Sequence, residues 1–190
     1  MTELEALEQE LLKPTDALVN DITRIEGDII LLGVGGKMGP SMAKLARRAI
    51  ERAGINKKII GVSRFSEAGT REELEADGIE TISADLLNEK DLAALPDAPN
   101  ILYLAGTKFG TTGKEAFTWA MNSYLPGRVA ERYKNSRIVA FSTGNVYPFT
   151  PIGSGGLSEE HTPAPVGEYG QSCLGRERIF QYFSERYQIP

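Results

Sequence analysis

Hydrophobic positions follow two alternating patterns along most of the chain. Short continuous apolar runs are typical of buried strands, and apolar residues that recur every three or four positions are typical of amphipathic helices. The runs predict strands at 28–33, 58–62, 79–84, 100–105 and 137–141. The helical pattern predicts helices at 38–53, 70–77, 88–94, 114–133 and 168–187. Strands separated by helices predict a parallel sheet covered on both faces, so we expect an α/β, doubly wound Rossmann fold.

The segment before the first predicted strand, residues 1–27, is predicted to be a helical extension. Its first part, 2–13, has one apolar side formed by Leu4, Leu7 and Leu11. Pro14 interrupts that helix, and Thr15 or Asp16 is suited to cap a second one. We expect this extension to pack on the sheet or on a partner.

The remaining residues, 28–190, are enough for one domain. The last predicted helix leads directly into Ile189-Pro190, where the sequence given ends. A helix of a doubly wound sheet leads into another strand. We therefore expect the sheet of this chain to lack its last strand or strands.

Composition restricts the classes of partner. A net charge of −5 at pH 7 gives no basic footprint for nucleic acid. Apolar runs stay well short of the roughly 20 residues of a membrane span, and the acidic N-terminus lacks the basic and apolar regions of a signal peptide. One cysteine cannot form an internal disulfide, and one cysteine with one histidine gives too few ligands for a metal site. We expect a cytoplasmic protein with no nucleic-acid, membrane or metal partner.

A glycine-rich segment joins the strand predicted at 28–33 to the helix predicted at 38–53. It reads Gly33-Val34-Gly35-Gly36-Lys37-Met38-Gly39. Such a segment turns sharply, exposes backbone N–H groups, and directs the positive end of a helix at an anion. Side chains at the points of close approach would block a pyrophosphate, so the glycines predict a dinucleotide site. A purely structural tight turn and a loop for a methyltransferase's methyl donor are the alternatives.

The end of the second predicted strand favours NADP over NAD. NAD sites usually place a carboxylate there for the ribose 2′-hydroxyl. This chain instead reads Ser63-Arg64 and has no carboxylate before Glu67. A guanidinium matches the oxygens of a 2′-phosphate in a fork. The alternative is that Arg64 is a solvated loop residue, and Lys37 either adds to the attraction or faces water.

Several later segments resemble one family in their order and spacing. They are Asp85-Leu86, Tyr103-Leu104-Ala105-Gly106, Asn122 with Gly127, Phe141-Ser142-Thr143-Gly144-Asn145-Val146-Tyr147, residues 159–163, and Tyr169-Gly170-Gln171-Ser172-Cys173. With the glycine loop, they make residues 28–190 similar to the N-terminal, cofactor-binding part of the extended short-chain dehydrogenase/reductase family, the NAD(P)-dependent epimerase/dehydratase group. The resemblance implies a Rossmann domain over residues 28–190 without the family's C-terminal substrate region.

The resemblance extends the cofactor site beyond the glycine loop. It implies that Asp85, with Leu86, contacts the adenine, and that residues 104–106 lie beside the cofactor. Asn122 resembles the family's structural asparagine on the long helix. The predicted cofactor is NADP in preference to NAD. The residues predicted to bind it are Gly33, Gly35, Gly36, Lys37, Met38, Gly39, Ser63, Arg64, Asp85, Leu86, Leu104, Ala105, Gly106 and Asn122.

The resemblance also implies the catalytic groups. Thr143 would hold the substrate oxygen, Tyr169 would be the general acid/base, and a lysine one turn later would stabilise the phenolate and hold the nicotinamide ribose. Cys173 stands at that lysine position, and a thiol carries no positive charge. Arg176, on nearly the same helix face, is one candidate to supply charge from two turns away. A nucleophilic Cys173 with His161 as its base is another interpretation.

Apolar residues on the last two long helices are expected first of all to pack in the core. They are Phe117, Met121, Tyr124, Ile179, Phe180 and Phe183. In the family that the chain resembles, these helices often form a four-helix dimer interface. We therefore expect a homodimer through helices 114–133 and 168–187. The Gly/Pro/Ser-rich stretch 148–167 is expected to line the mouth of a small-molecule substrate site.

Three interpretations of function remain open. We favour an NADP-preferring oxidoreductase or epimerase/dehydratase for a nucleotide sugar or another small hydroxyl or carbonyl compound, because Tyr169 and Thr143 are present. The second is a dinucleotide-binding sensor or structural protein whose chemistry is impaired at Cys173. The third is a piece of a protein that has no function alone.

Overall fold

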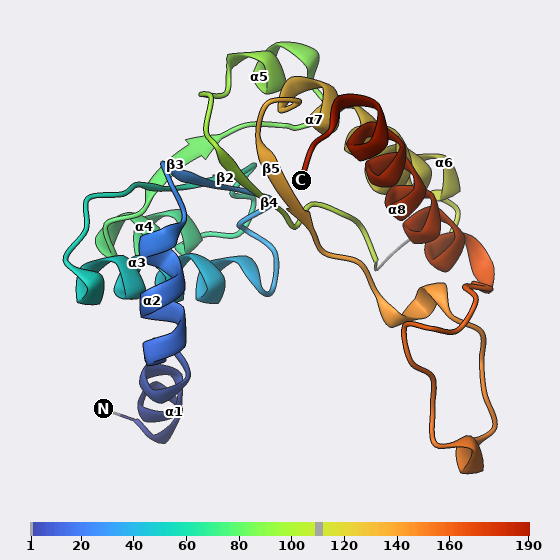
Figure 1. The fold of residues 1–190 in the computed structure, drawn as a ribbon, viewed down its shortest axis with the longest axis horizontal. Coiled ribbons are helices and arrows are strands. Elements are labelled where there is room, and N and C mark those ends of the chain that lie inside the picture. The colour runs from blue at the N-terminus through green and yellow to red at the C-terminus, as the bar shows by residue number, and fades with distance from the viewer. Residues whose placement is uncertain (1, 109–111) are drawn as a thin grey trace. The chain divides into compact units, whose positions relative to one another are not determined.

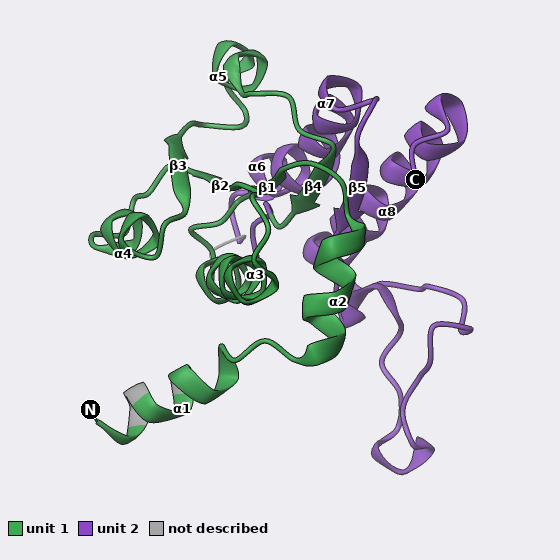
Figure 2. Cartoon of the chain, turned by 60° about the vertical axis from the view of Figure 1, so that its left-hand side comes forward, with its two compact units in different colours: residues 1–104 green, residues 105–190 purple. Residues whose placement is uncertain are grey.

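The computed structural model describes residues 2–108 and 112–190, apart from the side chains of Leu4, Glu5 and Glu8. Its elements alternate between strands and helices, as predicted (Figure 1). The chain divides into two compact units, residues 1–104 (unit 1) and residues 105–190 (unit 2), which Figure 2 distinguishes by colour. The predicted boundary after residue 27 stays a prediction.

Unit 1 contains most of the sheet. Its strands are β1 (Ile29–Leu32), β2 (Ile59–Ser63), β3 (Glu80–Ser83) and β4 (Asn100–Tyr103). Its helices are α1 (Glu3–Leu11), α2 (Asp16–Arg24), α3 (Gly39–Ala53), α4 (Thr70–Ala76) and α5 (Glu89–Ala94). β1 pairs in parallel with both β2 and β4, and β2 pairs in parallel with β3.

The strand order of the sheet is β3-β2-β1-β4-β5, where β5 is Arg137–Ala140. The strands that follow β1 first run outward to β3, and the order then returns to the other side of β1 at β4. This reversal is the topological switch of a Rossmann fold, and ligands of such sheets bind beyond the carboxyl ends of the strands there. The predicted α/β, doubly wound Rossmann fold is confirmed.

The core of unit 1 explains why the apolar runs become strands. All of β1 is buried, because residues on both of its faces pack against other apolar side chains. Leu31 and Val34 share one cluster with Ile50 of α3 and Leu74 of α4. Burying each such side chain stabilises the fold by about 1.5–3 kcal/mol. The segment that follows β1 is thereby fixed to a rigid support.

The N-terminal helices behave differently from each other. Thr15, rather than Asp16, caps α2, because its side chain accepts a hydrogen bond from the Leu18 N–H at 3.2 Å. α2 packs on α3 and buries Ile22. Leu7 and Leu11 of α1 are 56% and 69% exposed, so they do not pack on the sheet. Packing of α1 on a partner stays a prediction, and the side chain of Leu4 lies outside the described residues.

Unit 2 holds two long helical segments and a long loop. Its elements are α6 (Glu115–Trp119), the π-helical η1 (Ala120–Tyr124), α7 (Leu125–Arg132), β5, the 3₁₀ turns η2 (Gly144–Val146) and η3 (Ile152–Ser154), and α8 (Gly167–Tyr187). α8 lies along the α6–η1–α7 segment. The loop between η2 and α8 extends away from these helices (Figure 1).

The helix predicted at 114–133 is interrupted by the π turn η1. Pro126, the second residue after this turn, has no backbone N–H with which to continue the α-helical ladder. The π turn places two consecutive polar residues, Asn122 and Ser123, in buried positions. π turns of this kind are frequent at functional sites.

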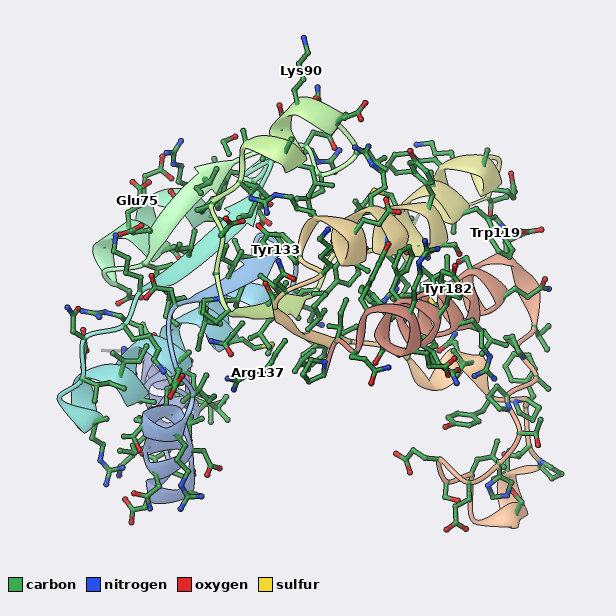
Figure 3. The ribbon with its side chains drawn as sticks, turned by 45° about the horizontal axis from the view of Figure 1, so that its top comes forward. Glu75, Lys90, Trp119, Tyr133, Arg137 and Tyr182 are labelled. Atoms are coloured by element: carbon green, nitrogen blue, oxygen red, sulfur yellow. The ribbon has the colours of Figure 1, made fainter. Side chains whose placement is uncertain are left out.

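The aromatic residues of these helices are more exposed than predicted. Phe117 and Tyr124 are 43% and 59% exposed, so the expectation that they pack in the core of this chain is wrong. Trp119 and Tyr182, labelled in Figure 3, are also exposed residues of unit 2. Within the described residues, every helix is too short or too polar to cross a membrane.

Candidate active site

The glycine loop begins where β1 ends. Gly33 adopts a φ of 92°, which favours glycine, and its N–H donates to the Val62 carbonyl at 2.8 Å. Two tight turns follow, in which Gly36 N–H donates to the Gly33 carbonyl and Gly39 N–H donates to the Gly36 carbonyl. The chain therefore reverses within seven residues, directly between β1 and α3.

Two further glycines of the loop lie close to other parts of unit 1. A Cβ atom on Gly39 would overlap the backbone of Val34, which cannot move without displacing the loop. A Cβ atom on Gly35 would lie 2.5 Å from the Ser63 Oγ at the end of β2. Glycine at position 35 therefore allows the loop to approach Ser63 at the end of the second strand.

The start of α3 is suited to an anion. Met38 precedes the helix without capping it by a side chain, and Pro40 occupies the first turn. The Gly39 N–H donates to the Gly36 carbonyl and the Met42 N–H to the Met38 carbonyl, and the helix dipole adds partial positive charge at this end. Lys37 and Met38 are exposed beside it. These features fit a dinucleotide pyrophosphate.

Ser63 and Arg64 occupy the end of β2, as predicted. The Ser63 Oγ accepts a long hydrogen bond from the Phe65 N–H at 3.4 Å, and Phe65 has a left-handed φ of 48°. The Arg64 side chain is exposed. The structure thus brings Ser63 to the glycine loop and leaves Arg64 at the surface.

Asp85 and Leu86 follow β3. The Asp85 Oδ1 accepts from the Leu87 N–H at 3.0 Å, and its own N–H donates to Asp91 Oδ2 at 2.9 Å. Leu86 is buried. These contacts give Asp85 a structural part in the turn, while its contact with an adenine stays a prediction.

Residues 104–106 extend β4 and pass from unit 1 into unit 2. The Leu104 N–H donates to the Leu32 carbonyl at 2.8 Å. In unit 2, Ala105 is buried and Gly106 is exposed. A Cβ atom on Gly106 would lie 2.7 Å from Arg176 Nη2 and 3.1 Å from Asn122 Oδ1. Glycine at position 106 therefore makes room for these two polar side chains.

Asn122 is the centre of a buried hydrogen-bond network, and its contact with a cofactor stays a prediction. Its Oδ1 accepts from the Thr107 N–H and from Arg176 Nη2, both at 3.0 Å. Its Nδ2 donates to the Thr107 carbonyl at 3.1 Å and to Ser172 Oγ at 3.0 Å. The Asn122 side chain is fully buried. It thus joins the segment after β4 to α8, which agrees with the structural role of its counterpart in the resemblance.

The structure brings Tyr169 and Thr143 together. Thr143 caps η2, and Tyr169 lies in the first turn of α8. Burial raises the pKa of the Tyr169 phenol, against the hydrogen bond with Thr143 and the Arg176 guanidinium, which lower that pKa. Burial is the larger effect, so the net shift moves the pKa of the phenol further above neutral pH.

Cys173 lies one turn after Tyr169 and is fully buried. Burial raises the pKa of its thiol, and the nearby Arg176 guanidinium lowers it to a lesser extent. A buried neutral thiol is a poor nucleophile. The hydrogen bonds described for His161 are with Ser158. These observations oppose the interpretation of Cys173 and His161 as a nucleophile and its base.

Two cations approach this site from different elements. Arg176 Nη2 lies 3.7 Å from the Cys173 Sγ, and Lys108 Nζ lies 5.9 Å from the centroid of the Tyr169 ring. Lys108 was not among the predicted site residues, although its place shortly after β4 was a signal for it. Across residues 2–108 and 112–190, no group of three or more His, Cys, Asp or Glu side chains is arranged to hold a metal.

The chain thus has a Rossmann fold with a glycine-rich loop after β1 and, in unit 2, Tyr169 beside Thr143. Solved structures with this fold include UDP-glucuronic acid 4-epimerase from Bacillus cereus in complex with NAD, at 23% identity and a TM-score of 0.71 over 86% of this chain and 54% of that one. The UDP-Glc/GlcNAc 4-epimerase from Campylobacter jejuni has 21% identity and a TM-score of 0.70 over 85% and 50%. A short-chain dehydrogenase/reductase superfamily protein from Agrobacterium tumefaciens with bound NAD has 21% identity and a TM-score of 0.62 over 82% of this chain and 44% of that one.

The chain spans about half the length of these solved structures. No family model and no curated protein matches the sequence. The similarity is therefore one of fold, and it confirms the fold implied by the resemblance.

Proposed function

We propose that this chain binds NAD(P) and acts as an oxidoreductase of the epimerase/dehydratase type on a nucleotide sugar or another small hydroxyl or carbonyl compound. The observation that carries the proposal is the placement of Tyr169 beside Thr143 in a chain whose first βα turn is a glycine-rich loop. The solved structures of this fold support it, since the Bacillus cereus epimerase is in complex with UDP-glucuronic acid and NAD.

The proposed cofactor is NADP in preference to NAD. The backbone of residues 33–39 and the uncapped start of α3 would hold the pyrophosphate. The exposed Arg64, beside Ser63 at the end of β2, would bind a 2′-phosphate. This preference rests on Ser63-Arg64 alone, and it differs from the NAD named with the solved structures.

Tyr169 and Thr143 are the residues proposed to take part in proton transfer. The nicotinamide, when bound, supplies or accepts the hydride. Thr143 would hold the substrate oxygen, and Tyr169 would exchange its proton. A tyrosine with its usual pKa of about 10 is in the proton-donating form at neutral pH, and burial raises the pKa of Tyr169 further. That form suits the reduction of a carbonyl better than the oxidation of an alcohol.

The second candidate is a dinucleotide sensor or structural protein without this chemistry. It is favoured by the uncharged Cys173 at the lysine position and by the raised pKa of Tyr169. The two candidates differ in turnover. Epimerisation of UDP-glucuronic acid or UDP-glucose, followed by chromatography and abolished by Tyr169→Phe, would favour the enzyme. Cofactor binding without turnover of either nucleotide sugar would favour the sensor.

We also propose a homodimer through the α6–η1–α7 segment and α8. The exposed aromatic residues Phe117, Tyr124 and Tyr182 support it, since large apolar side chains on two neighbouring helices are typical of an interface. Sedimentation of the chain and of Tyr124→Glu would test it: the chain should sediment as a dimer and the variant as a monomer. Cytoplasmic localisation stays a prediction from the sequence.

Calorimetric titration with NADPH and, separately, with NADH tests the cofactor proposal. We expect tighter binding of NADPH and loss of that preference in Arg64→Ala. Arg24→Ala is the matched control, because Arg24 is an exposed arginine of unit 1 that pairs only locally with Asp21. Tighter binding of NADH would overturn the role of Arg64, and binding of neither by the folded chain would overturn the proposed function.

A further inference from the structure

The side chain of Arg176 reaches back along α8 to the position of Cys173. Long side chains in a helix lean toward its N-terminus, over the preceding turn. The Arg176 Nη2 accordingly lies 3.7 Å from the Cys173 Sγ, although the two residues are three positions apart. The distance along the sequence from Tyr169 therefore overstates how far this charge lies from the phenol.

The guanidinium is held in place by groups from two other segments of unit 2. Its Nη1 donates to the Phe141 carbonyl at 2.8 Å, at the end of β5, and its Nη2 donates to Asn122 Oδ1 at 3.0 Å, in the π turn. Gly106 leaves the space that the guanidinium occupies. Arg176 is only 7% exposed. Since an arginine stays protonated in proteins, this is a fixed, largely desolvated positive charge.

We propose that Arg176, held by Asn122 and Phe141, supplies at Cys173 the positive charge that the resemblance places on a lysine, and so stabilises the Tyr169 phenolate during proton transfer. The inference rests on the proposed function, because it takes Tyr169 as the group that exchanges the proton. Arg176 acts through Tyr169 and is a positioning residue. With a cysteine at position 173, the positive charge near Tyr169 is thus supplied by Arg176 and is not lost.

The groups that face Tyr169 shift its pKa in both directions, and Thr143 lowers that pKa more than Arg176 does. Burial and the neighbouring Cys173 raise the pKa of Tyr169, and Thr143 and Arg176 lower it. Lys108 is exposed and lies against the ring face rather than in the helix. Glu177 acts on Cys173, whose pKa it raises. Lys108 is therefore the competing source of positive charge, and its removal is the natural control.

The ionisation of Tyr169 can be measured without cofactor or substrate. The chain has seven tyrosines, so the tyrosinate absorbance of each variant is compared with that of the same variant carrying Tyr169→Phe. We expect Arg176→Gln, which keeps an amide donor but loses the charge, to lower the ionisation constant of Tyr169 about tenfold. Arg176→Lys should keep it within about threefold, and Lys108→Gln should change it less than Arg176→Gln. An unchanged constant in folded Arg176→Gln, or a larger effect of Lys108→Gln, would overturn the proposal.

A second pair of variants tests the charge even where Arg176→Gln does not fold. Cys173→Glu and Cys173→Gln have the same size and differ in charge. Beside a fixed guanidinium, the carboxylate should be tolerated as well as the amide, so both variants should unfold at similar urea concentrations. Marked destabilisation of Cys173→Glu relative to Cys173→Gln would refute the assigned position of the charge. Because neither test uses NAD(P), failure of cofactor binding would contradict the proposed function and leave these measurements unaffected.

Discussion

Replacing Asn122 by alanine is expected to destabilise the chain far more than the loss of a few atoms implies. The Asn122 amide is fully buried and joins the segment after β4, the π turn and α8. Its Oδ1 accepts from Arg176 Nη2 and from the Thr107 N–H. Its Nδ2 donates to the Thr107 carbonyl and to Ser172 Oγ. Alanine would remove every one of these bonds together.

The magnitude follows from the kind of bond lost. A hydrogen bond to a charged group contributes about 1.5–3 kcal/mol and a neutral one about 1 kcal/mol. Loss of the bond to Arg176 and of the two bonds to Thr107 therefore costs about 4 kcal/mol. Ser172 adds little, since its hydroxyl also donates to the Tyr169 carbonyl. Small domains have a total stability of about 5–15 kcal/mol, so Asn122→Ala should leave unit 2 marginal.

Urea unfolding followed by circular dichroism measures this loss. Asn135→Ala is the matched control, because Asn135 is an exposed asparagine in a turn of the same unit. Exposed substitutions of this kind change stability by about 0.5 kcal/mol or less. If Asn122→Ala lost no more stability than Asn135→Ala, water would replace the amide, and the buried network would not hold this part of the fold together.

Three further predictions concern other parts of the chain. Lys57→Met should lower the unfolding free energy by about 1–3 kcal/mol, because the buried ammonium donates to the Ile22 carbonyl at the end of α2; limited proteolysis should then cut near residue 27. Gly39→Ala should abolish calorimetric NADPH binding, since the added Cβ displaces the loop. The unfolding free energy should fall above about pH 8.5, because burial raises the pKa of Cys173 and the unfolded thiol loses its proton first, at most by about 1.4 kcal/mol per pH unit.

Each of these has its own control. Lys58→Met removes a neighbouring exposed lysine and should leave the α2 attachment intact. Gly153→Ala adds a Cβ atom in open space and should not alter cofactor binding. Cys173→Ala removes the thiol, so its stability should fall less steeply between pH 8.5 and 10; an identical slope would show that Cys173 does not titrate differently on folding.

The sheet and the glycine loop were accessible to sequence reasoning because their signals are local. Apolar runs of a few residues become strands such as β1 wherever both faces are buried. Glycine is required at Gly33 by a positive φ and at Gly39 by the closeness of the Val34 backbone. Both requirements arise within a few residues of the glycine itself, so the sequence carries them without knowledge of tertiary contacts.

The π turn and the exposed aromatic residues were not accessible in the same way. A hydrophobic period near 3.6 predicts a helix but does not resolve a single wider turn such as Ala120–Tyr124. The same pattern does not separate core from interface. Phe117 and Tyr124 recur with the spacing of buried residues and are nevertheless exposed in this chain. Whether such residues are covered depends on what lies beside the helix, which the pattern alone does not contain.

The position of the Arg176 charge also depends on the direction of its side chain in the folded helix. The resemblance places a lysine four residues after Tyr169, and by sequence position alone Cys173 there indicates that a positive charge is lost. In the folded helix, the arginine three residues later covers the Cys173 position, because its side chain leans back one turn. The bare Gly106 and the buried Asn122 make that arrangement possible. A missing charge in a helix is therefore best sought at the long side chains one turn further on, together with the small residue that would have to make room for them.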